Sequence, residues 1–214
     1  MSFIVPEQIE EYAEVHTTPP LALLAELAEE TRATLAAPQM LTGTIEGRLL
    51  ELLVYALRPR RVLELGTYSG YSSLSMAAGL PEDGHIDTCE VDERHAEVAR
   101  RYIGRSPYAD RITVHVGPAL GTIERLGGDF DFVFVDADKE NYGSYYDALL
   151  PRLARGGLMA FDNTLWSGRV LDADDDSEAT RSIVELNDRI ARDERVVAVM
   201  LSVRDGITLV RLRA

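Results

Sequence analysis

Residues 61–72, RVLELGTYSGYS, predict a β-strand, a glycine-rich turn and the start of a helix. Apolar side chains dominate the first five positions, and Gly66 and Gly70 then allow a tight turn and a close approach of backbone to a ligand. The glycine spacing is G-x-x-x-G, not the G-x-G-x-x-G of dinucleotide-binding proteins. Glu64 precedes the turn and would repel a pyrophosphate but attract an ammonium group. The turn alone is also compatible with an ordinary strand-to-helix connection.

Outward from this stretch, short apolar runs and amphipathic segments alternate. Further strands are predicted at 86–92, 112–116, 130–136 and 157–162, and helices at 71–79, 93–103, 119–126, 141–153 and 178–191. Such alternation requires crossover connections and gives a parallel sheet that helices cover on both faces. Two final β-rich runs, 196–203 and 206–212, meet at Asp205-Gly206 and predict an antiparallel hairpin. We therefore expect a single-domain α/β protein with a seven-stranded, mostly parallel sheet.

The first 58 residues predict helices only. One helix covers 21–30, after Pro19-Pro20, and a second covers 44–57, where Thr42 or Thr44 could cap the start. We expect residues 1–58 to form a helical extension of the same domain, on its substrate and dimer side, and residues 59–214 to carry the sheet. The apolar face expected of the second helix consists of Ile45, Leu49, Leu52, Leu53 and Ala56.

The 214-residue chain has 22 basic and 36 acidic residues, which gives a formal net charge of −14. Such an acidic chain argues against nucleic acid as a partner, because phosphate binding needs clustered Lys and Arg. The single cysteine, Cys89, excludes a disulfide framework and fits a reducing compartment. The residues from Met1 onward show no signal-peptide pattern, and no run approaches the ~20 apolar residues that span a bilayer. We expect a cytoplasmic protein with no membrane partner.

Polar side chains follow the predicted strands at the edge where an open parallel sheet binds ligands. Asp136 ends the fourth strand, and Asp162 and Asn163 end the fifth. Two carboxylates and an amide oxygen are hard ligands that suit Mg²⁺ or a similar divalent cation. The alternative is that the two aspartates only cap the helices that follow. Glu90 ends the second strand, about 20 residues after the glycine turn, where an acid can bind the ribose hydroxyls of an adenosine-bearing cofactor.

Lys139 is the only lysine among the 22 basic residues, and it lies three residues after Asp136. A bound cation would lower the pKa of its amine, which could then act as a general base. Arginine cannot take this role because it stays protonated. A solvated surface charge is the usual role of a lysine, but a chain that uses arginine at every other basic position favours a role that needs a removable proton.

Together these residues resemble the cation-dependent O-methyltransferases, the group of catechol O-methyltransferase and the caffeoyl-CoA O-methyltransferases. The resemblance extends from Gln39 to the final hairpin. It implies a Rossmann-like methyltransferase fold, S-adenosylmethionine (SAM) as methyl donor, and Mg²⁺ or another divalent cation such as Mn²⁺ or Ca²⁺. It also implies methylation of one of two vicinal hydroxyls on a small phenol, and a homodimer built on the N-terminal helices. The motifs that carry it are 64–72, 81–84, 136–139, 141–142 and 156–166.

The resemblance also implies roles for single residues of this chain. Glu64 would bind the methionine end of SAM, and Glu90 would bind its ribose. The full set of SAM-contacting positions would be Met40, Thr42, Glu64, Gly66, Thr67, Ser72, Glu90, Ala119, Asp136 and Asp138. The cation ligands would be Asp136, Asp162 and Asn163. Asp136 and Lys139 would be catalytic, with Lys139 as the base, and the substrate would contact Lys139, Asn163 and Trp166.

The chain departs from the pattern of the plant caffeoyl-CoA enzymes. Ser167 lies where an asparagine is expected, and the segment 169–181, with its acidic run 172–176, differs. No N-terminal lysine is available for a CoA phosphate. A small free phenol is therefore a better candidate substrate than a CoA thioester.

Two other functions are weighed. A methyltransferase that acts on RNA or protein could share the fold, but the net charge of −14 and the cation-ligand trio oppose it. A non-catalytic nucleotide-binding protein would leave Asp136, Asp162, Asn163 and Lys139 unexplained. The four histidines show no metal-ligand spacing, no G-x-S-x-G hydrolase motif is present, and the three tyrosines within 142–146 are expected to be packing or dimer residues.

Overall fold

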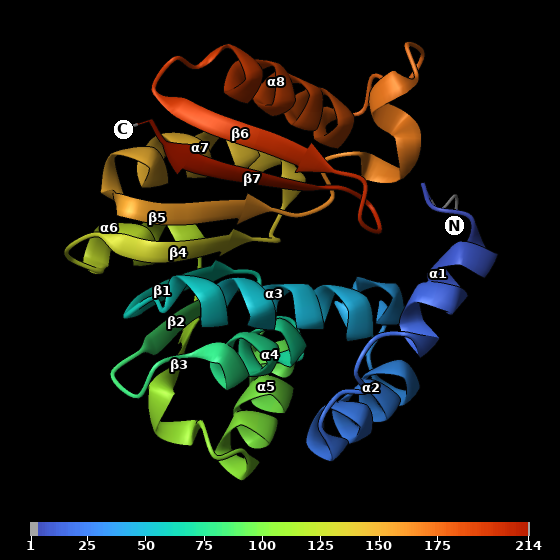
Figure 1. Cartoon of the computed structure of the whole chain (residues 1–214), viewed down its shortest axis with the longest axis vertical. Helices are drawn as coiled ribbons and strands as arrows, with labels where there is room; N and C mark the ends of the chain where they lie inside the picture. The colour runs from blue at the N-terminus through green and yellow to red at the C-terminus, as the bar shows by residue number, and fades with distance from the viewer. Residues whose placement is uncertain (1–3, 214) are drawn as a thin grey trace.

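Seven strands form one sheet in the order β3-β2-β1-β4-β5-β7-β6 (Figure 1). The computed structural model describes residues 4–213, so Met1–Phe3 of the N-terminal segment considered above and Ala214 lie outside the described residues. The first five strands pair in parallel, and β7 runs antiparallel to both β5 and β6. The predicted seven-stranded α/β fold with a C-terminal antiparallel hairpin is confirmed. The strands are β1 (Arg61–Leu65), β2 (His85–Glu90), β3 (Ile112–Val116), β4 (Phe130–Val135), β5 (Leu153–Phe161), β6 (Val196–Leu201) and β7 (Ile207–Leu212).

Strand β4 lies at the centre of the sheet, between β1 and β5. All of its side chains except that of Asp131 are buried, as expected for a strand that helices cover on both faces. Val135 pairs with Leu65 of β1 and with Phe161 of β5. Because the three strands end at the same level, the residues that follow them are brought to one edge of the sheet.

Helices cover both faces of the sheet. One core cluster joins the sheet to α2, α3, α4 and α5, and the other joins it to α6, α7 and α8. In Figure 1, α3 crosses in front of the sheet, and α8 lies beyond β6. The helices are α1 (Glu7–Val15), α2 (Ala22–Thr34), α3 (Gly43–Leu57), α4 (Tyr71–Gly79), α5 (Glu93–Arg105), α6 (Ala119–Arg125), α7 (Tyr142–Leu149) and α8 (Glu178–Arg192), with short 3₁₀ turns η1 (Pro38–Met40), η2 (Ala109–Arg111), η3 (Lys139–Asn141), η4 (Leu150–Arg152) and η5 (Trp166–Leu171).

Helix α3 buries a different face from the one predicted. Its buried residues are Glu46, Gly47, Leu50 and Val54, whereas Leu52 of the predicted face is 63% exposed. The reason lies at Gly47, where a Cβ would come within 2.8 Å of a side-chain oxygen on α4. The two helices therefore approach along the glycine side of α3. Apolar residues surround most of α3, so its periodicity does not select one side.

Three predicted boundaries are also wrong by four residues. The helix expected over 21–30 continues to Thr34. The helix expected over 141–153 ends at Leu149, because Pro151 follows in the turn η4 and cannot continue the helix. Strand β5 then begins at Leu153, not at residue 157. A register shift between Phe130 and Phe132 allows β5 to pair with β4 from Leu153 onward. Such an irregularity lengthens a strand beyond what its apolar pattern indicates.

The N-terminal helices pack against the α3–α4 pair, since α1 contacts α3 and α2 contacts α4. Neither predicted threonine makes a capping hydrogen bond at the start of α3. Thr42 occupies the N-cap position, but its side chain bonds no backbone N–H of the helix. Thr44 Oγ1 donates to Glu14 of α1 (3.1 Å). The division of the domain at residue 58 stays a prediction. Within residues 4–213, no helix is both long enough and apolar enough to cross a membrane.

Candidate active site

The glycine turn after β1 forms as predicted. Its first glycine is required by the packing of the turn against the backbone of Asp136. Gly66 has φ +98°, and a Cβ there would lie 2.0 Å from the carbonyl oxygen of Asp136. The backbone N–H groups of Gly66 and Thr67 both donate to the Cys89 carbonyl (3.0 and 3.1 Å), and the Asp136 N–H donates to the Leu65 carbonyl (2.8 Å). The ends of β1, β2 and β4 therefore converge at this turn.

Glu64 is fully buried at the end of β1. Its Oε2 accepts hydrogen bonds from the hydroxyls of Ser73 and Thr88 (2.6 Å from Thr88), whereas its Oε1 has no hydrogen-bond partner within residues 4–213. Burial raises the pKa of Glu64 to about 7, against the hydrogen bonds from Ser72, Ser73 and Thr88 that lower it, and the nearby Asp136 carboxylate adds to the rise. A buried carboxylate with a free oxygen fits a cationic ligand group.

Glu90, at the end of β2, is held by the backbone. Its Oε2 accepts from the N–H of Tyr68 (2.7 Å), and its Oε1 accepts from the N–H groups of Val91 and Asp92 (2.9 Å each). These bonds join the glycine turn to the end of β2 and fix the carboxylate in one orientation. Such an acid is placed as the ribose-binding prediction requires.

The other predicted cofactor positions differ in how far they are exposed. Thr67 Oγ1 lies 2.5 Å from Thr88 Oγ1, and both are buried. Thr42 before α3 and Ala119 at the start of α6 are also buried, whereas Met40 is 52% exposed. Asp138 is exposed, and its carboxylate accepts hydrogen bonds from Tyr145 OH (2.5 Å) and from Asn141.

Lys139 is nearly buried, with 9% of its surface exposed. Its Nζ donates to Asp136 Oδ1 (2.9 Å) and to the hydroxyl oxygen of Tyr142 (2.7 Å). The Tyr142 hydroxyl in turn donates toward the carbonyls of Asp162 (3.1 Å) and Val135 (3.2 Å). Burial lowers the pKa of Lys139, but the negative charges of Asp136 and Asp162 outweigh it and raise that pKa above its ordinary value. This direction is opposite to the lowering expected beside a bound cation, because here the ammonium group pairs with a carboxylate.

Asp162 and Asn163 follow β5 directly beside this pair. The Asp162 N–H donates to the Val135 carbonyl (3.0 Å), and Asp162 Oδ1 accepts from the Asn163 N–H (2.7 Å), with Asn163 at φ +57°. Burial raises the pKa of Asp162 well above its usual range, and the carboxylates of Glu46 and Asp136 raise it further. Neither aspartate accepts a cap hydrogen bond from a helix within the described residues, so the capping alternative is not supported.

The chemistry of this donor set fits a divalent cation. Asp136 and Asp162 supply carboxylate oxygens and Asn163 supplies an amide oxygen, from neighbouring strand ends. In the part of the chain that the structure describes, no three or more His, Cys, Asp or Glu side chains are grouped so that they could hold a metal ion. Carboxylates alone are therefore not a complete site, and the amide and further oxygen ligands would be needed.

Trp166, the predicted substrate contact, lies in η5 at φ +47°. Its ring is partly exposed, its Nε1 has no hydrogen-bond partner among residues 4–213, and the Arg169 guanidinium lies 5.6 Å from the ring centroid. The backbone N–H of Trp166 donates to the Asn163 carbonyl (3.0 Å). This hydrogen bond closes the turn after Asn163 and so fixes the position of the Trp166 backbone that carries the indole.

Several residues of this cluster have a role that the sequence does not indicate. Tyr142, predicted to be a packing or dimer residue, is fully buried in the core, and its hydroxyl also contacts Lys139. Glu46, which is buried on α3, forms an ion pair (2.7 Å) with the partly exposed Arg204 of the β6–β7 turn, near Asp162. The position of Glu46, four residues before the apolar Leu50 on one side of α3, was a signal available in the sequence. No sequence signal indicated Arg204, because its partner is 158 residues away.

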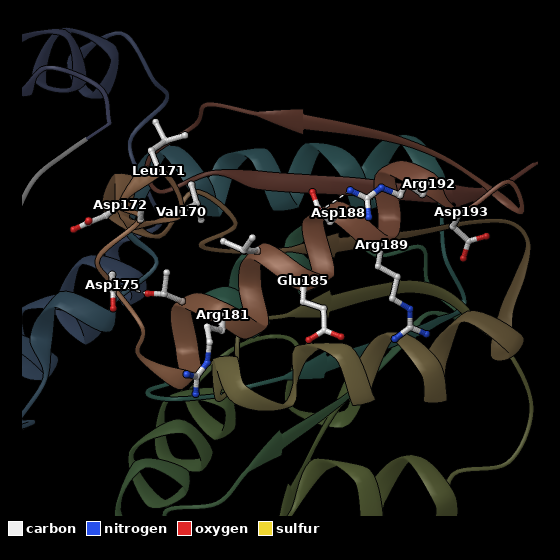
Figure 2. A pocket seen from close by; sticks show the side chains of 13 residues that line it. Val170, Leu171, Asp172, Asp175, Arg181, Glu185, Asp188, Arg189, Arg192 and Asp193 are labelled. Atoms are coloured by element: carbon white, nitrogen blue, oxygen red, sulfur yellow. Dashed lines mark hydrogen bonds and ion pairs between the residues drawn. The ribbon is translucent and has the colours of Figure 1, made fainter.

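Two cavities among residues 4–213 bear on where a ligand could bind. The larger, of about 950 Å³, lies on the outer side of α8 and contains none of the predicted site residues (Figure 2). It is bordered by the acidic run 172–176, in which Asp172 and Asp174 are exposed and Asp175 pairs with Arg169 (2.5 Å). The smaller cavity, of about 370 Å³, adjoins the site at Thr42 and Arg204 and is bordered by the acidic residues of α1. The chemistry therefore lies nearer the smaller cavity.

Comparison with known proteins identifies the family of this chain. The sequence model of the O-methyltransferase family matches residues 14–213. Caffeoyl-CoA O-methyltransferase 1 of Eucalyptus globulus is 38% identical over 184 residues, which cover 80% of this chain and 74% of that protein. Tricin synthase 2 of Oryza sativa is 39% identical over 178 residues, which cover 78% of this chain and 61% of that protein.

Solved structures give the same result. The O-methyltransferase of Bacillus cereus in complex with SAH is similar at 30% identity and a TM-score of 0.88, over 96% of this chain and 97% of that chain. The O-methyltransferase TomG of Streptomyces achromogenes, in complex with SAM, is similar at 28% identity and a TM-score of 0.88, over 97% and 96%. The chain therefore belongs to the O-methyltransferase family and has the fold of the SAM-dependent methyltransferases.

Proposed function

We propose that the protein transfers a methyl group from SAM to one hydroxyl of a vicinal-diol phenol, in a reaction that depends on a divalent cation. One observation carries this proposal. Asp136 lies in contact with the buried Lys139 amine and within electrostatic reach of both Glu64 and Asp162. The Lys139 amine, which would accept the proton, is thus bound to an acid that lies near both Glu64, which suits SAM, and Asp162, which suits a cation.

The methyl donor would bind along the edge formed by β1 and β2. The free Oε1 of Glu64 would accept a hydrogen bond from the ammonium group of SAM, and Glu90 would accept bonds from the ribose hydroxyls. The three backbone N–H groups that hold Glu90 already orient its carboxylate before SAM binds. Two similar bacterial structures contain SAM and SAH, which supports SAM as the methyl donor.

Asp136, Asp162 and Asn163 would hold the cation. A bound divalent cation lowers the pKa of a phenol hydroxyl and stabilises the phenolate that forms. When its carboxylate also binds a cation, Asp136 would stabilise the protonated form of Lys139 less than it does in the ion pair alone. The pKa of the Lys139 amine would then fall.

Lys139 is the general base in this proposal. Its Nζ removes the proton of the reacting hydroxyl, while the Tyr142 oxygen holds the amine in place. The phenolate oxygen then attacks the SAM methyl carbon in line, so that a C–O bond forms as the C–S bond breaks. Positioning of the two reactants supplies much of the rate increase in such a reaction.

A small free phenol fits this chain better than a CoA thioester. The smaller cavity beside Thr42 has four glutamates on α1, which would repel the phosphates of CoA, and two arginines. Plant relatives named for caffeoyl-CoA make the thioester the alternative to be tested. The cavity lining that carries this argument is Glu7, Glu10, Glu11, Glu14, Arg32 and Arg204.

Assembly and partners remain part of the proposal. Helix α1 exposes Ile9, Tyr12 and Val15, which would suit a homodimer built on the N-terminal helices. The net charge of −14 argues against nucleic acid as a partner. A native molar mass that equals one chain at every concentration would contradict the dimer.

A methyl-transfer screen tests the proposed substrate class. Radiolabelled SAM is offered with free catechols, caffeate derivatives and their CoA esters, each with and without Mg²⁺. We expect label in the free vicinal diols only when Mg²⁺ is present. Transfer to CoA esters alone would refute the free-phenol assignment, and transfer to none of the phenols would refute the substrate class.

A further inference from the structure

Glu46 is a buried acid that the proposed reaction does not yet use. It lies on the side of α3 that packs inward, next to Gly47, and only 1% of its surface is exposed. Gly47 allows α3 to lie close against α4, which fixes the position of the neighbouring glutamate. Glu46 lies within electrostatic reach of the carboxylates of both Asp162 and Asp136. It therefore lies close to the two acids proposed to bind the cation.

Arg204 holds one side of this carboxylate. Its Nη1 donates to Glu46 Oε2 (2.7 Å), its Nη2 donates to the Leu41 carbonyl (3.4 Å), and its Nε lies 3.9 Å from Glu10. Only 26% of the Arg204 side chain is exposed. By contrast, Glu46 Oε1 has no hydrogen-bond partner within residues 4–213.

The same turn also supports Asn163. Asp205, the residue after Arg204, lies within hydrogen-bonding reach of the Asn163 side chain and accepts a bond from the Ser167 N–H. The Asp205 carbonyl accepts from the Leu165 N–H (2.9 Å). The β6–β7 turn is therefore hydrogen-bonded to the segment that follows Asp162 and Asn163, two of the three proposed cation ligands. Glu46 is bound to the same turn through Arg204.

We propose that Glu46 is an outer-shell acid of the cation site and that Arg204 is the residue that positions it. This inference rests on the cation site proposed above. A purely structural ion pair would satisfy both oxygens of a buried carboxylate, whereas here one oxygen stays free beside two more carboxylates. Like charges so placed repel one another unless a proton or a cation is shared among them, and a divalent cation can be shared among all three carboxylates. Glu46 acts through Asp162 and bound water, because it does not complete a group of three acids around a metal-sized site in the described residues.

Metal binding to the full chain, without substrate, tests this role. Free Mn²⁺ is followed by electron paramagnetic resonance as the protein is titrated, so the readout does not depend on turnover. Glu46→Gln keeps the size of the side chain and an oxygen for Arg204 but removes the charge. We expect it to weaken Mn²⁺ binding about 10- to 100-fold, the usual cost of losing an outer-shell partner. Glu10→Gln, which removes the more distant partner of Arg204, is the control and should change the affinity less than about 2-fold.

A second variant keeps the test decisive if Glu46→Gln folds poorly, as judged by its melting temperature. Arg204→Lys keeps the charge but cannot contact Glu46 and the Leu41 carbonyl together, so we expect a smaller loss of Mn²⁺ affinity, about 3- to 10-fold. Unchanged affinity in every variant that folds, with wild-type protein binding Mn²⁺, overturns the outer-shell role and leaves the proposed function intact. Wild-type protein that binds no Mn²⁺ overturns the cation site itself. A raised KM for the phenol with unchanged Mn²⁺ affinity assigns Glu46 to the substrate and also overturns the inference.

Discussion

Replacement of Lys139 by arginine separates proton transfer from charge. The Lys139 amine lies 2.9 Å from Asp136 and 2.7 Å from the Tyr142 oxygen, and it is 9% exposed. Arginine keeps the positive charge that Asp136 binds, but it cannot give up its proton at any working pH. A general base contributes about 10²- to 10⁴-fold to a rate, which corresponds to roughly 3–5 kcal/mol of barrier. We therefore expect kcat of Lys139→Arg to fall by about 10² to 10⁴.

The assay is the initial rate of methyl transfer from radiolabelled SAM to a catechol at saturating Mg²⁺. SAM affinity and melting temperature are measured on the same samples, because a wider guanidinium in a buried position can displace its neighbours. Arg192→Lys, at an exposed pair with Asp188 on α8, is the matched control and should keep its rate. A Lys139→Arg enzyme that keeps its SAM affinity and turns over within about 3-fold of wild type would refute general-base catalysis by this residue.

Two further predictions follow from buried groups near the site. Gly66→Ala should lower the free energy of unfolding by about 2–5 kcal/mol in urea denaturation, because the new Cβ would lie 2.0 Å from the Asp136 carbonyl at a φ that disfavours alanine. Gly104→Ala, in α5 with open space at its Cβ, is its control, and an equal loss there would contradict the clash. Burial raises the pKa of Glu64 from 4.5 to about 7, so the ligand-free protein should lose about 3 kcal/mol of stability as the pH rises from about 4.5 to above 7. Glu64→Gln should remove that part of the pH dependence and weaken SAM binding, and an unchanged stability–pH curve would show that Glu64 is not the titrating group.

The strand ends that carry the site could be predicted from the sequence because the pattern there is local. Short apolar runs bounded by glycine or acidic residues predicted the residues that follow β1, β4 and β5, and parallel pairing then brought them to one edge. The bounds of α4 and β3 also agree with the prediction. The wrong beginning of β5 arose from a register shift that no apolar pattern reveals.

The missed parts of the site depend on contacts between distant segments. The buried side of α3 is decided by the fit of Gly47 against α4, because a helix that is apolar most of the way round has no single periodic face. Glu46 became significant only when the β6–β7 turn placed Arg204 against it. The raised pKa of Lys139 likewise comes from its ion pair with Asp136. The sequence shows that the two residues are three positions apart, but it does not show that they pair.

The central claim, cation-dependent methylation of a vicinal diol, is tested most directly by one comparison of rates. The wild-type protein is assayed with labelled SAM and 1,2-dihydroxybenzene in Mg²⁺, then in excess EDTA, then after Mg²⁺ is restored, with the monophenol as the parallel acceptor. We expect transfer to the diol in Mg²⁺, loss of transfer in EDTA and recovery when Mg²⁺ is added back. We expect little transfer to the monophenol, which cannot chelate a cation through two oxygens. Full turnover of the diol in excess EDTA would contradict the central claim.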